Sequence, residues 1–281
     1  MPVGGAADRF ALAVGNALVG NPADAAALEI TLAGPTLRAS CELGCVLYGA
    51  PFLLSSDRQE LKPGVTFTLS AGEEVRIGGT PRGVRAYFCV RGGLQQKVIL
   101  GSRSGLLPLA AGAELTCLAG TIGSRFVQPP STWDGELFVL RALPGSQADW
   151  FESQPLYEGR FIVEPASNRM GLRLSGDRLS RRDQTATEPA VELVSEPTCW
   201  GTVQVTNDGK CIVLGVDGQS IGGYPKIAQV ISADIDKLGQ LRPGDEISFA
   251  RVTLEQAETL YRAKQQELAE WTTRLRISLA T

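Results

Sequence analysis

The sequence has 281 residues, of which 43% are hydrophobic and 20% are charged. This is the composition of an ordinary folded protein, which excludes disorder, collagen-like repeats and coiled coils. The formal net charge is -3 and no lysine or arginine run occurs, so nothing points to nucleic acid or an anionic membrane as partner. Histidine is absent, which excludes Ser-His-Asp and Cys-His catalysis and histidine-based zinc or haem sites.

The sequence also bears on compartment and thiol chemistry. It contains no stretch that approaches the length of an apolar membrane span, and its N-terminus lacks the pattern of a secretion signal, so we expect a cytoplasmic protein. Six cysteines are scattered without a CxxC spacing: Cys41, Cys45, Cys89, Cys117, Cys199 and Cys211. We therefore predict buried free thiols rather than disulfides or a structural zinc site.

The first half of the chain predicts one short helix followed by short strands. Asp8 is a suitable N-cap for a helix that runs to Leu18, with Gly20 and Pro22 beyond its end. Alternating or continuous apolar patterns separated by glycine- and proline-containing turns then predict strands at residues 28–32, 65–69, 75–77 and 84–90. Short strands at such intervals are typical of a β-barrel.

A proline pair, Pro129-Pro130, predicts a linker between an N-terminal β domain at 1–130 and a C-terminal cyclophilin-like β-barrel domain at 136–281. Strand patterns in the second domain cover residues 136–141, 212–214, 228–231 and 247–249. Thr253 and Gln256 then fit a capping box that opens an amphipathic helix. We expect a mostly β fold with two β-barrel-like domains and few helices, including this C-terminal one.

Two segments carry arginines that could bind an anion. In 101–104, Arg103 follows a strand pattern and could hold a carboxylate bidentately, although a turn with one solvated arginine is the alternative. In 167–173, Asn168, Arg169 and Arg173 lie together without an intervening acid. If this segment is a strand, the two arginines share one face; the alternative is a strand edge kept soluble by arginines.

A third segment, 219–226, combines Gly222 and Gly223 with Tyr224 and Lys226. The glycines allow the backbone to approach a ligand, and the tyrosine and lysine could orient or polarise a carbonyl oxygen; a tight loop with a surface lysine is the alternative. The segment is neither a Walker loop nor a dinucleotide fingerprint, so we expect no ATP binding by this chain. No aspartate spacing fits a calcium loop, and we assign no metal.

Taken in order, these segments resemble the allophanate hydrolase subunit 2 family, also described as the biotin-dependent carboxyltransferase family and as the C subunit of 5-oxoprolinase. The residues that carry the resemblance are spread over most of the chain: 8–9, 17–22, 28–29, 83–87, 92–93, 100–104, 143–145, 150–151, 167–174, 195–196, 222–227, 231–234 and 241–245. Family members usually begin with about two dozen further residues, or about two strands. They also commonly have methionine where this chain has Ala7.

The resemblance implies one component of an enzyme complex. The β domains of the family resemble cyclophilin-like barrels and are similar to the carboxyltransferase part of urea carboxylase. The complex would hydrolyse 5-oxoproline to glutamate with ATP, using an allophanate hydrolase subunit 1-like companion and a TIM-barrel-type lactam-utilisation subunit. This chain would be inactive alone and would carry no cofactor, with ATP bound by a partner.

The resemblance also suggests roles for individual residues. Arg169 and Arg173 would bind the substrate carboxylate, Asn168 would orient it, and Tyr224 with Lys226 would polarise the reacting carbonyl or phosphate. Asp8 is explained at least as well by capping.

Two alternatives remain open. The chain could be a carboxyltransferase component for urea or a related amide, with biotin arriving on another protein because no Ala-Met-Lys-Met site is present. It could also be a regulatory antagonist of a kinase-inhibitor protein.

Overall fold

The structure is a computed structural model that describes residues 4–105, 107–128, 137–152, 154–182 and 193–280. The chain divides into two compact units. The barrel unit comprises Met1–Ala7 and Asp134–Lys264, and the sheet unit comprises Asp8–Trp133 and Gln265–Thr281. Within the described ranges, no helix is both long and apolar enough to cross a membrane.

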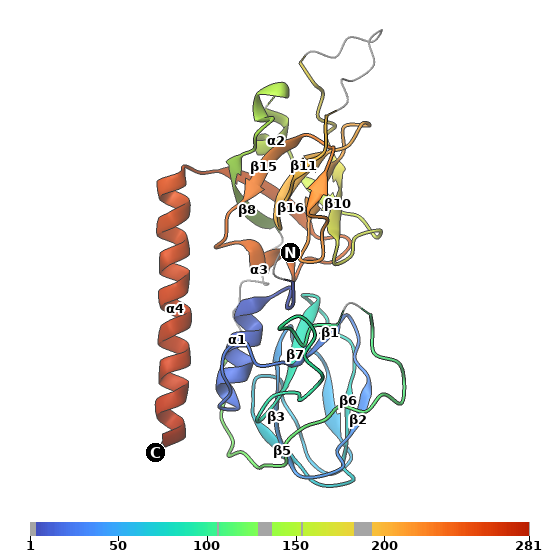
Figure 1. The fold of residues 1–281 in the computed structure, drawn as a ribbon, viewed down its shortest axis with the longest axis vertical. Helices are drawn as coiled ribbons and strands as arrows, with labels where there is room; N and C mark the ends of the chain where they lie inside the picture. Colours follow the sequence, from blue (N-terminus) through green and yellow to red (C-terminus); the bar gives the residue numbers. More distant parts are fainter. Residues whose placement is uncertain (1–3, 106, 129–136, 153, 183–192, 281) are drawn as a thin grey trace. The chain divides into compact units, whose positions relative to one another are not determined.

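Seven strands of the barrel unit form a closed barrel in the order β10-β13-β12-β15-β8-β16-β9 (Figure 1). Their bounds are β8 (Leu137–Pro144), β9 (Phe161–Val163), β10 (Gly171–Gly176), β12 (Thr202–Val205), β13 (Cys211–Leu214), β15 (Lys226–Val230) and β16 (Glu246–Arg251). Neighbours pair antiparallel except β8 and β16, which pair parallel. The short elements α2 (Gln154–Glu158), η2 (Ala148–Trp150) and α3 (Ile235–Leu238) lie between strands.

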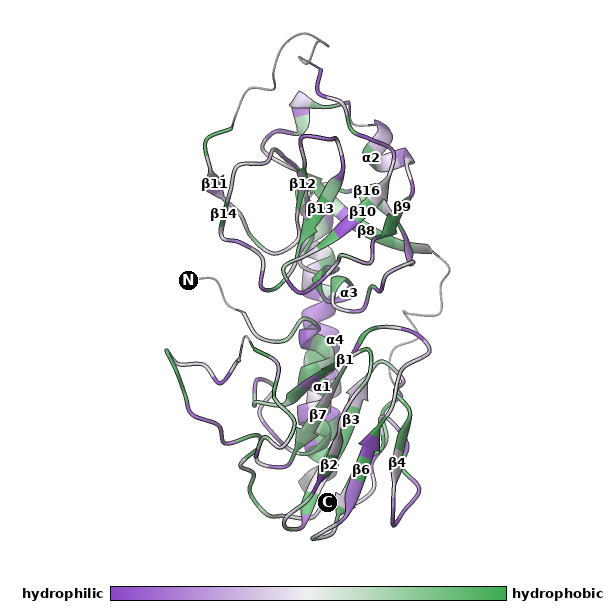
Figure 2. Cartoon of the chain, turned by 90° about the vertical axis from the view of Figure 1, so that its right-hand side faces the viewer, coloured by the Kyte–Doolittle hydropathy of each residue, from purple (hydrophilic) through white to green (hydrophobic). Residues whose placement is uncertain are grey.

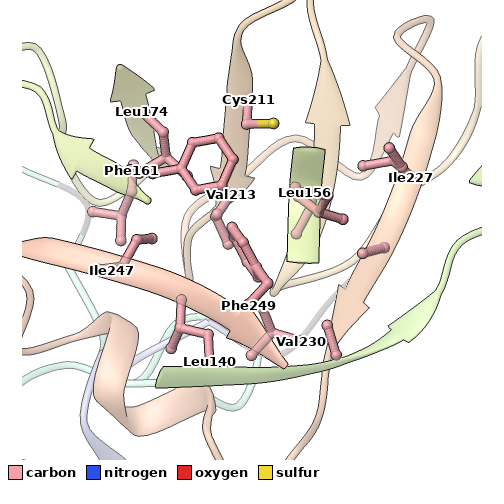
Figure 3. Packing of buried hydrophobic residues seen from close by; sticks show 14 of the residues in the cluster. Leu140, Leu156, Phe161, Leu174, Cys211, Val213, Ile227, Val230, Ile247 and Phe249 are labelled. Atoms are coloured by element: carbon pink, nitrogen blue, oxygen red, sulfur yellow. The ribbon is translucent and has the colours of Figure 1, made fainter. Parts of the chain in front are cut away.

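Apolar side chains fill the barrel because alternate residues of each strand point inward. Figure 3 shows Phe161, Val213 and Phe249 converging in this interior. The rings of Phe161 and Phe249 meet edge to face, with centroids 5.7 Å apart. A ribbon outside the barrel consists of β11 (Glu196–Pro197) and β14 (Ile221–Gly222), and Figure 2 shows it as a separate pair of strands.

The sheet unit contains two sheets and a helix. One sheet has the order β1-β7-β3-β5 and the other β2-β6-β4. The bounds are α1 (Arg9–Leu18), β1 (Leu28–Thr31), β2 (Thr36–Arg38), β3 (Leu43–Gly49), β4 (Leu54–Ser56), β5 (Phe67–Leu69), β6 (Glu74–Ile77) and β7 (Arg85–Val90). Strands β3 and β7 are buried along their whole length, which is why they have continuous apolar runs.

The predicted helix starts are confirmed at both ends of the chain. Asp8 caps α1 by accepting a hydrogen bond from the Ala11 N–H at 2.8 Å. Helix α4 (Leu254–Ala280) opens with the predicted capping box: Thr253 N–H donates to Gln256 Oε1, and Gln256 N–H donates to Thr253 Oγ1. The mostly β fold with few helices is likewise confirmed.

All six cysteines are free, as predicted, but their burial is mixed. Cys45, Cys89 and Cys211 are buried, whereas Cys199 is exposed, so the prediction of buried thiols is wrong for Cys199. The predicted domains, 1–130 and 136–281, stay a prediction. The proline pair on which that boundary rests lies outside the described residues.

Candidate ligand site beside strand β15

Lys226 is the best-defined member of the predicted sites. It opens β15, and its side chain, 10% exposed, forms an ion pair with Glu196 of the β11–β14 ribbon, with 2.5 Å between Nζ and Oε2. The hydrogen bond from Lys226 is the main reason that the pKa of Glu196 is lowered. Glu196 is therefore ionised at neutral pH, and a positive charge and a negative charge face each other beneath the ribbon.

Gln147 holds the backbone of Lys226 in place. Its N–H donates to the Lys226 carbonyl at 3.0 Å, and its Oε1 accepts from the Lys226 N–H, also at 3.0 Å. Its Nε2 donates to Glu196 Oε2 at 3.3 Å. Gly145 permits this close packing, because a Cβ at that position would lie 2.3 Å from the Lys226 carbonyl oxygen. The lysine is thus fixed from both its backbone and its ammonium group.

The predicted glycines and tyrosine lie next to this ion pair in the chain. Gly222 is the ribbon residue opposite Glu196, and a Cβ on it would lie 2.5 Å from Gln219 Nε2. Gly223 passes close to Leu193, whose carbonyl oxygen would lie 3.3 Å from an added Cβ. The side chain of Tyr224 is 37% exposed. A site with a cation, a phenol and amide donors can bind a ligand through an oxygen atom and polarise its carbonyl group.

The arginine segment is divided by the start of β10. Arg169 precedes the strand and binds Asp217 bidentately, with Nε–Oδ2 at 2.6 Å and Nη2–Oδ1 at 3.0 Å. Its Nη2 also donates to the Gly5 carbonyl at 2.7 Å. Asn168 shapes the turn, since its Oδ1 accepts from the Met170 N–H at 2.8 Å. The condition under which the two arginines would share a strand face is not met, because β10 begins only at Gly171.

Arg173 differs from Arg169 in having an open guanidinium. It points away from the barrel interior because its neighbours Leu172 and Leu174 are core residues. Among the described residues its guanidinium forms no ion pair. A cavity of about 130 Å³ lies here, with Arg173, Lys210, Glu164 and Asp208 in its wall. Lys210 forms an ion pair with Glu164 at 3.0 Å, whereas Arg173, the other cation in this wall, forms none with a described residue.

Arg103 belongs to the sheet unit, whereas the seven other predicted site residues belong to the barrel unit. It lies on an exposed loop, and its Nε donates to the Gln96 carbonyl at 3.0 Å. Four residues that contact or neighbour the predicted ones were missed by the sequence analysis: Gln147, Glu196, Gln204 and Asp217. Glu196 could not have been found locally, because 30 residues separate it from Lys226.

The family of the chain follows from comparison with known proteins. A family model described as "Carboxyltransferase domain, subdomain A and B" matches residues 1–251, and the chain belongs to this family. It is 32% identical to the C subunit of 5-oxoprolinase from Haemophilus influenzae over 93% of this chain and 86% of that protein. It is 34% identical to the C subunit of 5-oxoprolinase from Escherichia coli over 90% of this chain and 84% of that protein.

Larger proteins contain a related region. The chain is 26% identical to the urea amidolyase of Saccharomyces cerevisiae, covering 92% of this chain but 16% of that protein. A crystal structure of TTHA0988 matches with a TM-score of 0.78 and 37% identity, over 88% of this chain and 50% of that one. The urea carboxylase of Kluyveromyces lactis shares the fold, with a TM-score of 0.85 at 24% identity over 96% of this chain and 26% of that one. The chain thus spans half or less of these solved chains.

Proposed function

We propose that this chain is a subunit of an ATP-dependent 5-oxoprolinase that hydrolyses 5-oxoproline to glutamate, and that it is inactive alone. The observation that carries the proposal is its similarity, over most of both chains, to two proteins named as the C subunit of 5-oxoprolinase. Its partners would be an allophanate hydrolase subunit 1-like protein and a TIM-barrel-type lactam-utilisation subunit. The sequence has no Walker loop, which is consistent with nucleotide binding by a partner.

Two cations of the barrel unit, Lys226 and Arg173, suit by charge the carbonyl and the carboxylate of 5-oxoproline, and the strand pairings place three strand spacings between them. Lys226 and Tyr224 would polarise the lactam carbonyl, on which negative charge develops when water attacks. Gly222 and Gly223 would let the backbone approach the ring. The open guanidinium of Arg173 suits the substrate carboxylate.

The other predicted binding residues have more limited roles in this proposal. Arg169 would have to exchange Asp217 for the ligand, so it contributes chiefly by holding the 168–170 turn that contains Asn168. Arg103 lies on an exposed loop of the sheet unit, and its role in substrate binding stays a prediction.

A second candidate function is supported by the urea amidolyase relatives and by the family description itself. The chain would then be a carboxyltransferase component acting on urea or a related amide, with biotin carried by another protein. Lys226 would polarise the carbonyl in this reaction as well, because carboxyl transfer to an amide also develops charge on a carbonyl oxygen.

Reconstitution distinguishes the candidates. The purified chain and its genomically adjacent partners are assayed separately and mixed for ATP hydrolysis and glutamate formation that depend on 5-oxoproline. We expect turnover only in the mixture, and no inhibition by avidin. Dependence on bicarbonate with avidin sensitivity would favour the carboxyltransferase. A stable complex without turnover of either substrate would favour a regulatory antagonist.

A further inference from the structure

Gln204, on strand β12 of the barrel, carries a side-chain amide that none of the contacts described above uses. Its side chain is almost completely buried, the residue being 1% exposed. Within the described part of the chain, Gln204 Nε2 and Gln96 Nε2 are the two buried side-chain nitrogen or oxygen atoms without a hydrogen-bond partner. A buried amide donor without an acceptor destabilises the folded state, so its presence requires an explanation.

The position of Gln204 places it under the same ribbon as the Lys226 site. Val203 and Val205 point into the barrel core, so Gln204 projects outward between them. In the β12–β15 ladder Gln204 is paired with Lys226, and the register shifts at this point. Bulges of this kind redirect side chains beside active sites.

Gly222 leaves the space that the Gln204 amide occupies. The backbone of Gly222 is not in the left-handed region, so its conformation is open to other residues. A Cβ at this position would lie 2.7 Å from Gln204 Nε2 and 2.5 Å from Gln219 Nε2, so the ends of these two side chains would have to shift. The glycine thus leaves room for two side-chain amides against the ribbon.

The charges around Gln204 indicate which oxygen it would bind. Lys226 and Glu196 form an ion pair whose charges offset each other, and Gln204 itself is neutral. A buried carboxylate would need a compensating charge that this pair does not offer, whereas a neutral carbonyl needs only a donor. An amide or lactam carbonyl is thus the better match.

We infer that Gln204 Nε2 donates a hydrogen bond to the carbonyl oxygen of an amide- or lactam-bearing ligand bound beneath the β11–β14 ribbon, beside Lys226. This rests on the proposed function in that 5-oxoproline is such a lactam. It adds a substrate-contacting residue that selects for the carbonyl. Gln204 Nε2 lacks an acceptor in the free protein, which is unfavourable, and it gains one when the ligand binds.

NMR of the ¹⁵N-labelled chain tests the contact without turnover. The side-chain amide signal of Gln204 is assigned by its loss in Gln204→Met, and that of Gln96 by its loss in Gln96→Met. The probes are 5-oxoproline, 2-pyrrolidinone, which keeps the lactam without the carboxylate, and pyrrolidine, which lacks the carbonyl. We expect saturable shifts of the Gln204 signal with both lactams, none with pyrrolidine, and an unmoved Gln96 signal. A Gln204 signal that ignores the lactams, or responds equally to pyrrolidine, overturns the inference.

Kinetics of the assembled complex provide the second arm. Gln204→Met has nearly the same size but no donor, so we expect a higher melting temperature together with a KM for 5-oxoproline raised at least about tenfold. Gln96→Met, the matched control in the sheet unit, should raise the melting temperature without changing KM. If Gln204→Met misfolds, Gly222→Ala displaces the amide instead and should raise KM similarly. An unchanged KM in a folded variant contradicts the inference.

The two arms also separate this inference from the proposed function. A Gln204 signal that responds to lactams in a protein whose complex has no 5-oxoprolinase activity would refute the proposed function and keep the carbonyl contact. 5-Oxoprolinase activity together with a Gln204 signal that does not respond to lactams would support the proposed function and refute the carbonyl contact.

Discussion

Two arginines with the same sequence context have different physical roles. The Arg169 guanidinium is occupied by Asp217 and by the Gly5 carbonyl, and the side chains of the ion pair are 29% and 17% exposed. It therefore ties the 168–170 turn to the 215–217 turn and to the chain start. Arg173 has no such partner among the described residues and stands at the wall of a cavity. We therefore expect Arg169 to contribute to stability and Arg173 to ligand binding.

Alanine substitution of each arginine tests this division. Arg169→Ala leaves the half-buried Asp217 carboxylate without its partner, so we expect the free energy of unfolding to fall by roughly 1–3 kcal/mol. Arg173→Ala should leave that free energy nearly unchanged and lower turnover by the assembled complex more than about tenfold. Urea unfolding and steady-state kinetics provide the two measurements. The reverse pattern, a destabilising Arg173→Ala and a neutral Arg169→Ala, would contradict the assignment.

At the level of helices and strands, the buried carboxylate of Asp234 links helix α3 to strand β8. Asp234, immediately before α3, has a fully buried side chain and accepts hydrogen bonds from Arg141 Nε at 2.8 Å and from the Arg141 N–H at 2.9 Å. Lys237 Nζ lies 2.9 Å from Asp234 Oδ1. Burial alone would raise the pKa of Asp234, but these hydrogen bonds and charges outweigh it, and the pKa is lowered.

A lowered pKa in the folded state makes stability depend on pH in a defined direction. Asp234 contributes stability above its ordinary pKa of 3.8, and the contribution is lost as the pH falls through the lower pKa of the folded protein. We expect Asp234→Asn to lower the free energy of unfolding by about 3 kcal/mol at neutral pH. That difference from the parent protein should shrink below pH 3.8. Urea midpoints across this range measure it, and a difference that grows on acidification would rule out the pair as its origin.

The elements that the sequence predicted are those that local chemistry determines. The α1 cap at Asp8 and the capping box at Thr253 depend on residues within three positions of each other, and the apolar patterns of β7 and β16 reflect their own burial. The parallel β8–β16 pairing, the β11–β14 ribbon and the bulge at Gln204 depend on residues far apart in sequence. The residues of the candidate ligand site could be chosen from the sequence, where they stay a prediction, whereas their neighbours Gln147, Glu196 and Gln204 could not.

At the scale of the whole molecule, each unit takes a piece from the other end of the chain. The first seven residues belong to the barrel unit, where Arg169 binds Gly5, and the residues from Gln265 onward belong to the sheet unit. In the sheet unit the Leu275 carbonyl of α4 accepts a hydrogen bond from Arg125 at 3.4 Å. Seven of the eight predicted site residues lie in the barrel unit, and Arg103 lies in the sheet unit.

Lys226→Ala tests the candidate ligand site beside β15 most directly. The rate of glutamate formation from 5-oxoproline is measured for complexes assembled with the parent chain, with Lys226→Ala and with Lys226→Arg, after the complexes have been shown to have equal stoichiometry. We expect Lys226→Ala to lower turnover more than about tenfold while the complex stays intact, and Lys226→Arg, which keeps the charge, to restore part of it. Full turnover by the Lys226→Ala complex would contradict a ligand site beside β15.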